Sequence, residues 1–212
     1  MKLRLLSILL LFVASVGVLI WLYDGKAFTP PKHSRSSWHE IIVDLEACGR
    51  LKHLKARQYK HFAEIAAAEK RPDAERLFRA IAFSEQLQEQ NCASAIRRLG
   101  GSYTPPPEIA LFGGPTDRNL ERCLGIERYR FGKRSDAEIR RALSRENRYA
   151  ARLLIWAAAT DLREIFLLER CTGFETESFA VCPGCGNLYS TNHLDHYCPH
   201  CLTPGEEFVR FK

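Results

Sequence analysis

Four cysteines near the C-terminus have the spacing of a metal site. They form two Cys-x-x-Cys pairs that begin at Cys182 and Cys198, with twelve residues between the pairs. Two such hairpins can bring four thiolates together around one ion, and both iron and zinc accept this ligand set. So short a tail could scarcely build a core without the ion. The sequence therefore predicts one Fe or Zn ion held by Cys182, Cys185, Cys198 and Cys201.

Three histidines in the same segment, His193, His196 and His200, are alternative ligands for such an ion. A histidine would have to replace a cysteine, because a tetrahedral site takes only four ligands. The four thiolates already complete the set, which favours the all-cysteine site.

The other four cysteines fall near the ends of predicted helices, at Cys48, Cys92, Cys123 and Cys171. The helical topology described below brings together only two pairs, Cys48 with Cys92 and Cys123 with Cys171. We expect two disulfides, which would indicate an oxidising compartment. The alternative is four buried free thiols that behave as small hydrophobic side chains.

The first residues read as a membrane anchor. From Leu5 to Tyr23 there are 19 residues without a charge, which as a helix at ~1.5 Å per residue would span roughly 28 Å. A cleaved signal peptide would have a shorter apolar run. The sequence therefore predicts a single-pass anchor over residues 1–23 with a linker over 24–36. We expect the N-terminus to be cytoplasmic, and hence the body to be periplasmic or extracytoplasmic.

Apolar periodicity predicts four helices in the body, over about 38–70, 72–100, 116–143 and 147–173. Whether the third helix runs unbroken through Gly132 stays open. Residues 101–115 contain three consecutive prolines and two adjacent glycines, so they form no helix and can travel the length of a bundle. The tail over 178–212 is then a separate small β module.

Two short segments recur at nearly constant offsets. Residues 44–48 resemble residues 119–123 at an offset of 75, and residues 74–78 resemble residues 150–154 at an offset of 76. Two similar helical hairpins joined by a long crossover describe a ferritin-like four-helix bundle. We therefore predict a mainly α fold with this bundle over residues 37–173.

Polar residues interrupt the apolar stripes where such bundles carry a di-metal site. Lys52 lies mid-helix on the inward stripe of the first helix, and Glu127 is its counterpart on the third. The second and fourth helices carry polar pairs with i, i+3 spacing, which are Glu85 with Gln88 and Asp161 with Glu164. Two histidines of the first helix, His53 and His61, fall off this stripe and are expected at the surface.

With this pattern of polar residues, the chain resembles the rubrerythrin family over about residues 38–212. The Cys-Pro-x-Cys-Gly form of the first cysteine pair and the aromatic final segment 208–211 also look like the rubredoxin module of that family. The resemblance implies a bundle that reduces peroxide at a di-iron site, an iron-binding module that supplies electrons, and a homodimer. It places the bundle ligands at Lys52, Glu85, Gln88, Glu127, Arg130, Asp161 and Glu164.

Only Glu85 and Glu127 keep the residue type of the family, whereas Lys52 and Arg130 put cations where the family has glutamates. Burying uncompensated carboxylates costs several kcal/mol each. We favour a salt-bridged remnant of the metal site. One bound divalent ion and a working di-iron centre are the alternatives.

The formal net charge of +6 is spread thinly, and no dense basic block interleaved with aromatics predicts nucleic-acid binding. The leading hypothesis is a membrane-anchored, rubrerythrin-like protein that transfers single electrons through the four-cysteine iron site, its peroxide-reducing centre lost or altered. The alternative is a non-catalytic subunit of a membrane protein complex with a structural zinc ribbon.

Overall fold

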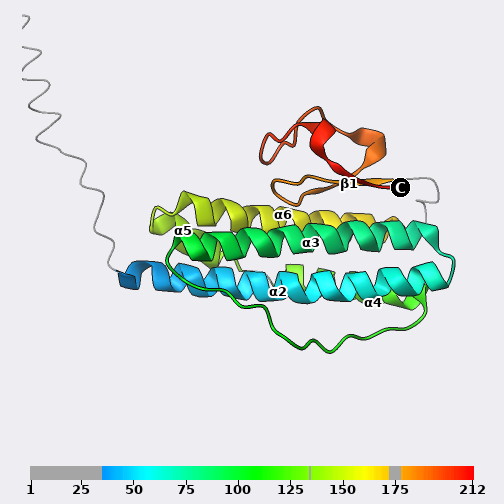
Figure 1. The fold of residues 1–212 in the computed structure, drawn as a ribbon, viewed down its shortest axis with the longest axis horizontal. Helices are drawn as coiled ribbons and strands as arrows, with labels where there is room; N and C mark the ends of the chain where they lie inside the picture. Colours follow the sequence, from blue (N-terminus) through cyan, green and yellow to red (C-terminus); the bar gives the residue numbers. More distant parts are fainter. Residues whose placement is uncertain (1–34, 134, 172–177) are drawn as a thin grey trace, which may run out of the picture. The chain divides into compact units, whose positions relative to one another are not determined.

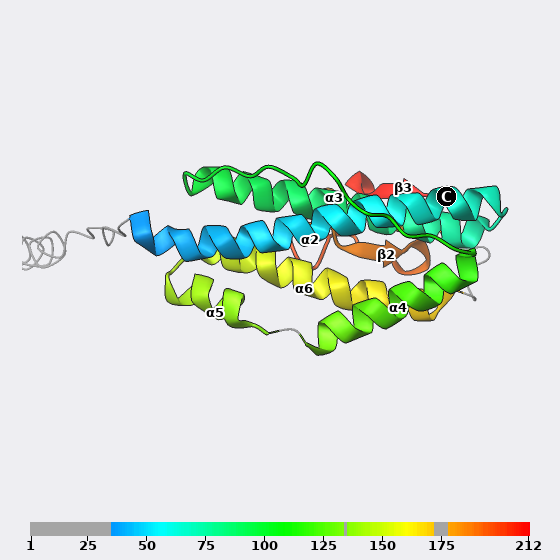
Figure 2. The same cartoon turned by 90° about the horizontal axis from the view of Figure 1, so that it is seen from below.

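The computed structural model describes residues 35–133, 135–171 and 178–212, of which Ser37–Lys212 form one compact unit. This part of the chain contains five α-helices, which are α2 (Arg35–Ala68), α3 (Pro72–Arg98), α4 (Thr116–Gly132), α5 (Ala137–Ser144) and α6 (Arg148–Glu169). Helices α2, α3 and α6 lie side by side, and α4 and α5 follow one another along α6 (Figures 1 and 2). The mainly α fold predicted from the sequence is confirmed.

The hairpin between α2 and α3 follows from its turn residues. Lys70 adopts a positive φ of 58° in the turn, and Pro72 occupies the first turn of α3, where its missing N–H costs nothing. Asp73 and Glu75 in the first turn, and Arg97 and Arg98 in the last, complement the helix dipole. The rings of Phe62 and Phe78 then pack across the two helices with centroids 5.5 Å apart.

The predicted third helix is broken, so the described bundle has five helices rather than the four that we expected. Helix α4 ends at Gly132, and α5 begins at Ala137, whose backbone N–H donates to Ser135 Oγ at 3.1 Å. Glycine has a low helix propensity, and a serine that accepts from a helix N-terminus favours a new start. The two shorter helices together cover the same side of α6.

The long connection between α3 and α4 runs along the bundle without helix or strand between 101 and 115 (Figure 1). Gln58 of α2 fixes it, because its side-chain amide donates to Phe112 O at 2.7 Å and accepts from Phe112 N at 3.2 Å. The Phe112 ring also lies 5.4 Å from the ring of Phe62. The crossover is thus part of the packed structure.

A three-stranded antiparallel sheet covers one side of the bundle. Its strands are β1 (Phe179–Val181), β2 (Leu188–Ser190) and β3 (Val209–Phe211), in the order β2-β1-β3. Phe179, Val181 and Leu188 are fully buried in the same apolar cluster as residues of α2, α3 and α6. The predicted C-terminal module therefore shares a core with the bundle within the compact unit. The predicted boundary between the two lies outside the described residues.

Two apolar clusters fill the bundle. One contains Ile41 and Leu45 of α2 with Leu154 of α6, and the other contains Phe62 of α2 with Leu167 of α6. Lys52 and Lys55 of α2 fall between the two clusters along the helix, and both side chains are buried. The polar site of the bundle is built on this stretch of α2.

Among the described residues, no helix is long and apolar enough to cross a bilayer. Helix α2, for example, carries charged side chains along its whole length. This finding contradicts the membrane localisation with an extracytoplasmic body that we predicted. The predicted anchor over residues 1–23 lies outside the described residues, as does all but the end of the predicted linker, where α2 already begins at Arg35.

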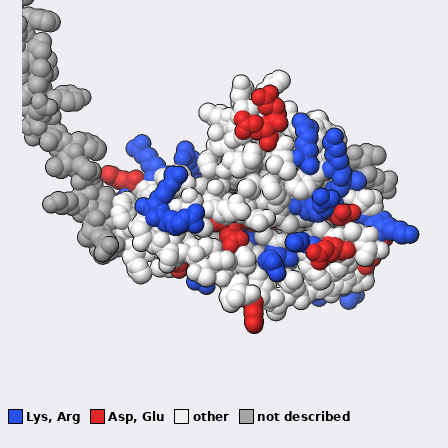
Figure 3. All heavy atoms as spheres, in the orientation of Figure 1, with Lys and Arg blue, Asp and Glu red and all other residues white. Residues whose placement is uncertain are grey.

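Charged side chains are scattered on the face seen in Figure 1. Figure 3 shows basic and acidic groups separated by uncharged surface over the bundle, rather than one continuous basic patch. The arrangement on this face agrees with the thin spread of charge along the sequence.

Candidate functional site

The four predicted metal ligands converge in the C-terminal module. The sulfurs of Cys182, Cys185, Cys198 and Cys201 all lie within 4.8 Å of one another. Cys182 Sγ is 3.4 Å from Cys201 Sγ, and Cys185 Sγ is 3.5 Å from Cys198 Sγ. Four soft sulfur donors at such distances fit a tetrahedral Fe or Zn ion. This fit depends only on the four sulfur ligands and does not distinguish iron from zinc.

The two cysteine pairs are built by the same backbone turn. In the first, Cys182 N donates to Asn187 O at 2.9 Å and Gly186 N donates to Cys182 O at 2.9 Å. In the second, Cys198 N donates to Thr203 O and Leu202 N donates to Cys198 O, both at 2.8 Å. Gly186 and Leu202 occupy equivalent positions and both have positive φ angles, of 80° and 64°. The repeated turn explains why the second cysteine of each pair follows the first by three residues.

Polar side chains contact the sulfurs of the centre. The Tyr189 hydroxyl lies 3.2 Å from Cys198 Sγ, and the Thr203 hydroxyl lies 3.1 Å from Cys201 Sγ. A hydrogen bond from Cys185 lowers the pKa of the Cys182 thiol to about 4, and the same bond raises the pKa of Cys185. Of the two, Cys182 therefore favours the thiolate form, which is the form that binds metal. Among the residues whose side chains the structure describes, the cluster of possible ligands consists of the four cysteines alone, which favours the all-cysteine site over a histidine ligand.

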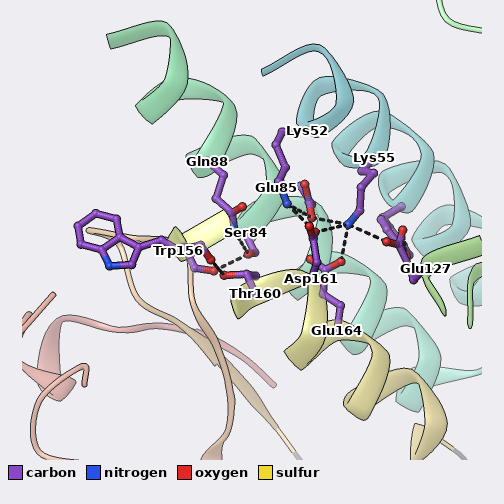
Figure 4. Close-up of polar contacts among 12 residues, drawn as sticks. Lys52, Lys55, Ser84, Glu85, Gln88, Glu127, Trp156, Thr160, Asp161 and Glu164 are labelled. Carbon is purple, nitrogen blue, oxygen red and sulfur yellow. Dashed lines mark hydrogen bonds and ion pairs between the residues drawn. The ribbon is translucent and has the colours of Figure 1, made fainter. Parts of the chain in front are cut away.

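Within the bundle, two lysine ammonium groups lie among four carboxylates (Figure 4). Lys52 Nζ is 3.0 Å from Glu85 Oε1 and 2.7 Å from Asp161 Oδ1. Lys55 Nζ lies 2.8–3.1 Å from an oxygen of each of the four carboxylates, which belong to Glu85, Glu127, Asp161 and Glu164. Both lysine side chains are at most 2% exposed, and those of Glu85 and Glu164 are fully buried. The cluster is a desolvated ion-pair network.

The protonation of this network follows from its contacts. Burial alone would lower the pKa of Lys52 and of Lys55, but the surrounding carboxylates, Asp161 foremost, outweigh burial and raise both values. Burial would raise the pKa of Asp161, and the two ammonium groups hold it below its usual range. Burial and the charge of Glu85 raise the pKa of Glu164 well above its usual value. The network therefore favours the charged form of both lysines and the protonated form of Glu164.

Positive side chains face the carboxylates of the cluster. Lys52 and Lys55 face the carboxylates of Glu85, Glu127 and Asp161, and Arg130 adds a third positive charge 3.7 Å from Glu127. Arg130 is 39% exposed, so it lies at the rim rather than inside. Three carboxylates, those of Glu85, Asp161 and Glu164, have oxygens close enough together to hold a metal ion. The lysine ammonium groups, however, already occupy the positions next to these oxygens.

Two sequence predictions about the cluster need correction. Gln88 does not join the carboxylates, because its side chain lies 3.4 Å from Ser84 Oγ and packs against Gly186 of the C-terminal module. Lys55 was missed, although it lies three residues after Lys52 and four before the buried Tyr59. That i, i+3, i+7 spacing is the signal that could have found it. His53 is partly buried against Glu89 at 3.0 Å, and His61 is near Glu64, so neither reaches the cluster.

All eight cysteines are free thiols in the structure, so neither predicted disulfide is formed in it. Cys48 and Cys92 lie in one apolar cluster of the bundle, and Cys123 and Cys171 lie in the other, as the topology predicted. The thiol of Cys123 hydrogen-bonds to Tyr59, and burial raises the pKa of Cys123 and of Cys171 to about 12. Of these four bundle cysteines, Cys48 and Cys92 hydrogen-bond to each other.

No protein-family model matches the sequence, and no curated relative was found. Similar folds occur among solved structures of nigerythrin. The mixed-valence state has 21% sequence identity and a TM-score of 0.69, with 81% of this chain and 86% of that chain covered. The fully reduced, all-ferrous state has 23% identity and a TM-score of 0.68 over 86% and 91% of the two chains. Together with the helical bundle and the four-cysteine cluster, this likeness shows that the chain has a rubrerythrin-like architecture.

Proposed function

We propose that this protein transfers single electrons through one iron ion bound by Cys182, Cys185, Cys198 and Cys201. The observation that carries the proposal is the convergence of four buried or half-buried sulfurs within 4.8 Å. Iron held by four thiolates supplies a one-electron redox couple. The residues of the chain bind the ion, exclude most water from it and place donors against its sulfurs.

The environment of the sulfurs suits a redox role. Tyr189 and Thr203 place hydroxyls 3.2 Å and 3.1 Å from two of the sulfurs, and hydrogen bonds to thiolates stabilise the more negative, reduced form of such a site. The Tyr189 ring also stacks on Phe208 at 5.2 Å and closes one side of the centre. The similar nigerythrin structures are described as mixed-valence and all-ferrous, which supports iron rather than zinc in this chain.

We also propose that the bundle holds no di-iron centre. Such a centre needs carboxylate and imidazole ligands around two ions. Here Lys52 Nζ and Lys55 Nζ lie 2.7–3.1 Å from the oxygens that would bind the ions, and the described cluster contains no histidine. A divalent ion would have to displace an ammonium group, and the two like charges would repel. The ammonium groups themselves supply the positive charge that the carboxylates require.

A second function is a structural zinc site in a non-catalytic interaction protein. The spacing of the four cysteines suits zinc equally, and the sheet that carries them shares its core with the bundle, as a stabilising module would. In that case no electron moves through the module.

One spectrum separates the two functions. The purified full-length protein is expected to be red in its oxidised form, with thiolate-to-iron charge-transfer absorption that disappears on addition of dithionite. Elemental analysis of the same sample should find iron. A colourless protein that contains zinc and does not change on reduction would reject electron transfer in favour of the structural site.

A further inference from the structure

Cys48 and Cys92 form a thiol pair that the proposed electron transfer does not use. Cys48 lies on α2 and Cys92 on α3, and the two thiols hydrogen-bond to each other. The two helices approach closely here, since a Cβ placed on Gly49 would lie 3.5 Å from the Cβ of Cys92. Cys92 is 2% exposed, whereas Cys48 is partly exposed. Cys48 is thus the more exposed residue of the pair.

Cys48 borders a pocket. Cys48 lines a pocket of about 270 Å³, together with Asp44 and Lys52 of α2, Glu138 of α5 and Asp161 of α6. The rest of the lining is apolar and consists of Ala47, Leu51, Leu154 and Ala157. A pocket of this size admits a small molecule next to Cys48. Cys92 does not line this pocket.

The surrounding charges favour a reactive sulfur at Cys48. The hydrogen bond from Cys92 lowers the pKa of the Cys48 thiol, burial opposes this, and the ammonium group of Lys52 lowers it further against Asp161 and Glu85. The same hydrogen bond and burial raise the pKa of Cys92 well above its usual value. The thiolate, which is the nucleophile of thiol chemistry, is therefore favoured at the more exposed member of the pair.

We propose that Cys48 and Cys92 form a reversible dithiol–disulfide site, in which Cys48 attacks a small hydroperoxide that enters the pocket. The Cys48 thiolate attacks one peroxide oxygen, an S–O bond forms and the O–O bond breaks. The released alkoxide or hydroxide takes a proton from solvent, and Cys48 is oxidised to a sulfenic acid. The Cys92 thiol then attacks that sulfur, so that an S–S bond forms, the S–O bond breaks and water leaves.

The two electrons that reduce the peroxide come from the two thiols. An external dithiol returns the pair to its reduced form by thiol–disulfide exchange. This site needs neither the four-cysteine centre nor a metal in the bundle, so it stands independently of the function proposed above.

The chain contains an internal control for this chemistry. Cys123 and Cys171 also lie at the same end of the bundle, but burial raises the pKa of each to about 12 and no hydrogen bond joins their thiols in the described structure. At neutral pH these two thiols should react far more slowly than Cys48.

The test uses the reduced full-length protein with its metal retained. Hydrogen peroxide is added, the remaining thiols are alkylated, and peptides are mapped by mass spectrometry. We expect a Cys48–Cys92 cross-linked peptide that dithiothreitol reverses, and alkylation of Cys48 before peroxide that is at least about tenfold faster than that of Cys171. In Cys92→Ser, dimedone should trap a sulfenic acid at Cys48. In Cys48→Ser, Cys92 should stay reduced.

The proposal is overturned if wild-type Cys48 and Cys92 both remain alkylatable after peroxide, or if Cys48 reacts no faster than Cys171. Oxidation of Cys92 in Cys48→Ser would equally reject Cys48 as the attacking thiol. The wild-type measurements need no variant, so the test holds even if a substitution impairs folding, which circular dichroism would detect.

Discussion

At the scale of single residues, Lys52 and Lys55 determine what the interior of the bundle can bind. Each ammonium group lies within 3.1 Å of at least two carboxylates, in surroundings where both lysines are almost fully buried. Such pairs are balanced against a large desolvation cost, so removing one lysine leaves buried negative charge that the other lysine alone must offset. The buried carboxylates therefore require both lysines for the stability of the folded protein.

We predict that Lys52→Met lowers the free energy of unfolding by about 3–5 kcal/mol, because Glu85 and Asp161 lose a buried partner. Lys60→Met is the matched control, since Lys60 lies exposed on the same helix and should change stability by less than about 0.5 kcal/mol. Urea denaturation followed by circular dichroism measures both. Equal effects of the two substitutions would show that Lys52 is not paired as the structure places it.

Glu164 gives the network a distinct dependence on pH. Its pKa is raised in the folded state by burial and by Glu85, so the folded protein keeps a proton that the unfolded chain releases above about pH 4.3. Glu164 therefore reduces stability as the pH rises. Glu164→Gln removes this effect, and we predict that the stability of the variant relative to wild type improves from pH 4 towards pH 8, by up to about 1.4 kcal/mol per pH unit.

Asp161→Asn is the control of opposite sign. The pKa of Asp161 is held below its usual range, so its contribution to stability is present above about pH 4 and is lost as the pH falls below that value. This variant should lose most stability relative to wild type at neutral pH and less below pH 4. Chemical denaturation at several pH values measures both differences. Differences that do not vary with pH would contradict the assigned protonation states.

The residues of the cluster were only partly predictable. Lys52 could be found because it interrupts an apolar stripe. Lys55 was missed because the inward stripe of the helix was taken to run from Lys52 to Ala56, four residues further, rather than to Lys55, three residues further. Arg130 was expected inside, yet its long side chain reaches the rim, where it is 39% exposed. Gln88 faces a module that is far away in sequence, and local periodicity carries no information about such a contact.

At the scale of elements, α3 is the surface on which the C-terminal module docks. Ser84 Oγ donates to Gly186 O, and Asn91 Nδ2 donates to Gly184 O at 3.1 Å. A Cβ on Gly186 would lie 2.9 Å from Gln88 Cγ and 3.0 Å from Ser84 O. The equivalent Leu202 of the second cysteine pair is 74% exposed, so a side chain fits the same turn where no helix is near. The glycine is therefore required for docking as well as for its φ of 80°.

We predict that Gly186→Ala destabilises the docked module by about 1–3 kcal/mol while the four cysteines still bind their metal. Hydrogen exchange should show loss of protection in β1 and β2, with unchanged metal content. Gly125→Ala is the control, because Gly125 lies within α4 with open space around its Cβ position, and alanine there should stabilise the helix. An unchanged exchange pattern in Gly186→Ala would contradict the close contact with α3.

The order of the elements was largely predictable, and the break in the third helix was not. Pro72 and the prolines after residue 104 predict the hairpin and the crossover, because proline removes a helical N–H. The end of α4 at Gly132 depends instead on a glycine that many helices tolerate. Packing of α4 and α5 against α6 decides between a kinked and a broken helix, and a single segment does not contain that information.

At the scale of the whole molecule, a rubrerythrin-like fold combines a four-cysteine centre with a bundle whose buried carboxylates pair with two lysine ammonium groups. The spacing of the cysteines was sufficient to predict the four-cysteine centre, because local turns fix that site. The pairing in the bundle depends on side chains from α2, α3, α4 and α6 that meet only in the folded chain. Together, the two sites predict one metal ion per chain.

The most direct test is the number of metal ions per chain, measured by elemental analysis of the protein purified in the presence of excess ferrous iron. We predict one ion per chain in the wild-type protein and none in Cys182→Ser, because losing one thiolate opens the four-thiolate ligand set, and Lys52 and Lys55 already pair with the carboxylates of the bundle. Circular dichroism should show that the helices of the variant remain. Two additional irons that persist in Cys182→Ser would place a di-iron centre among Lys52, Lys55 and the carboxylates, and would contradict the account.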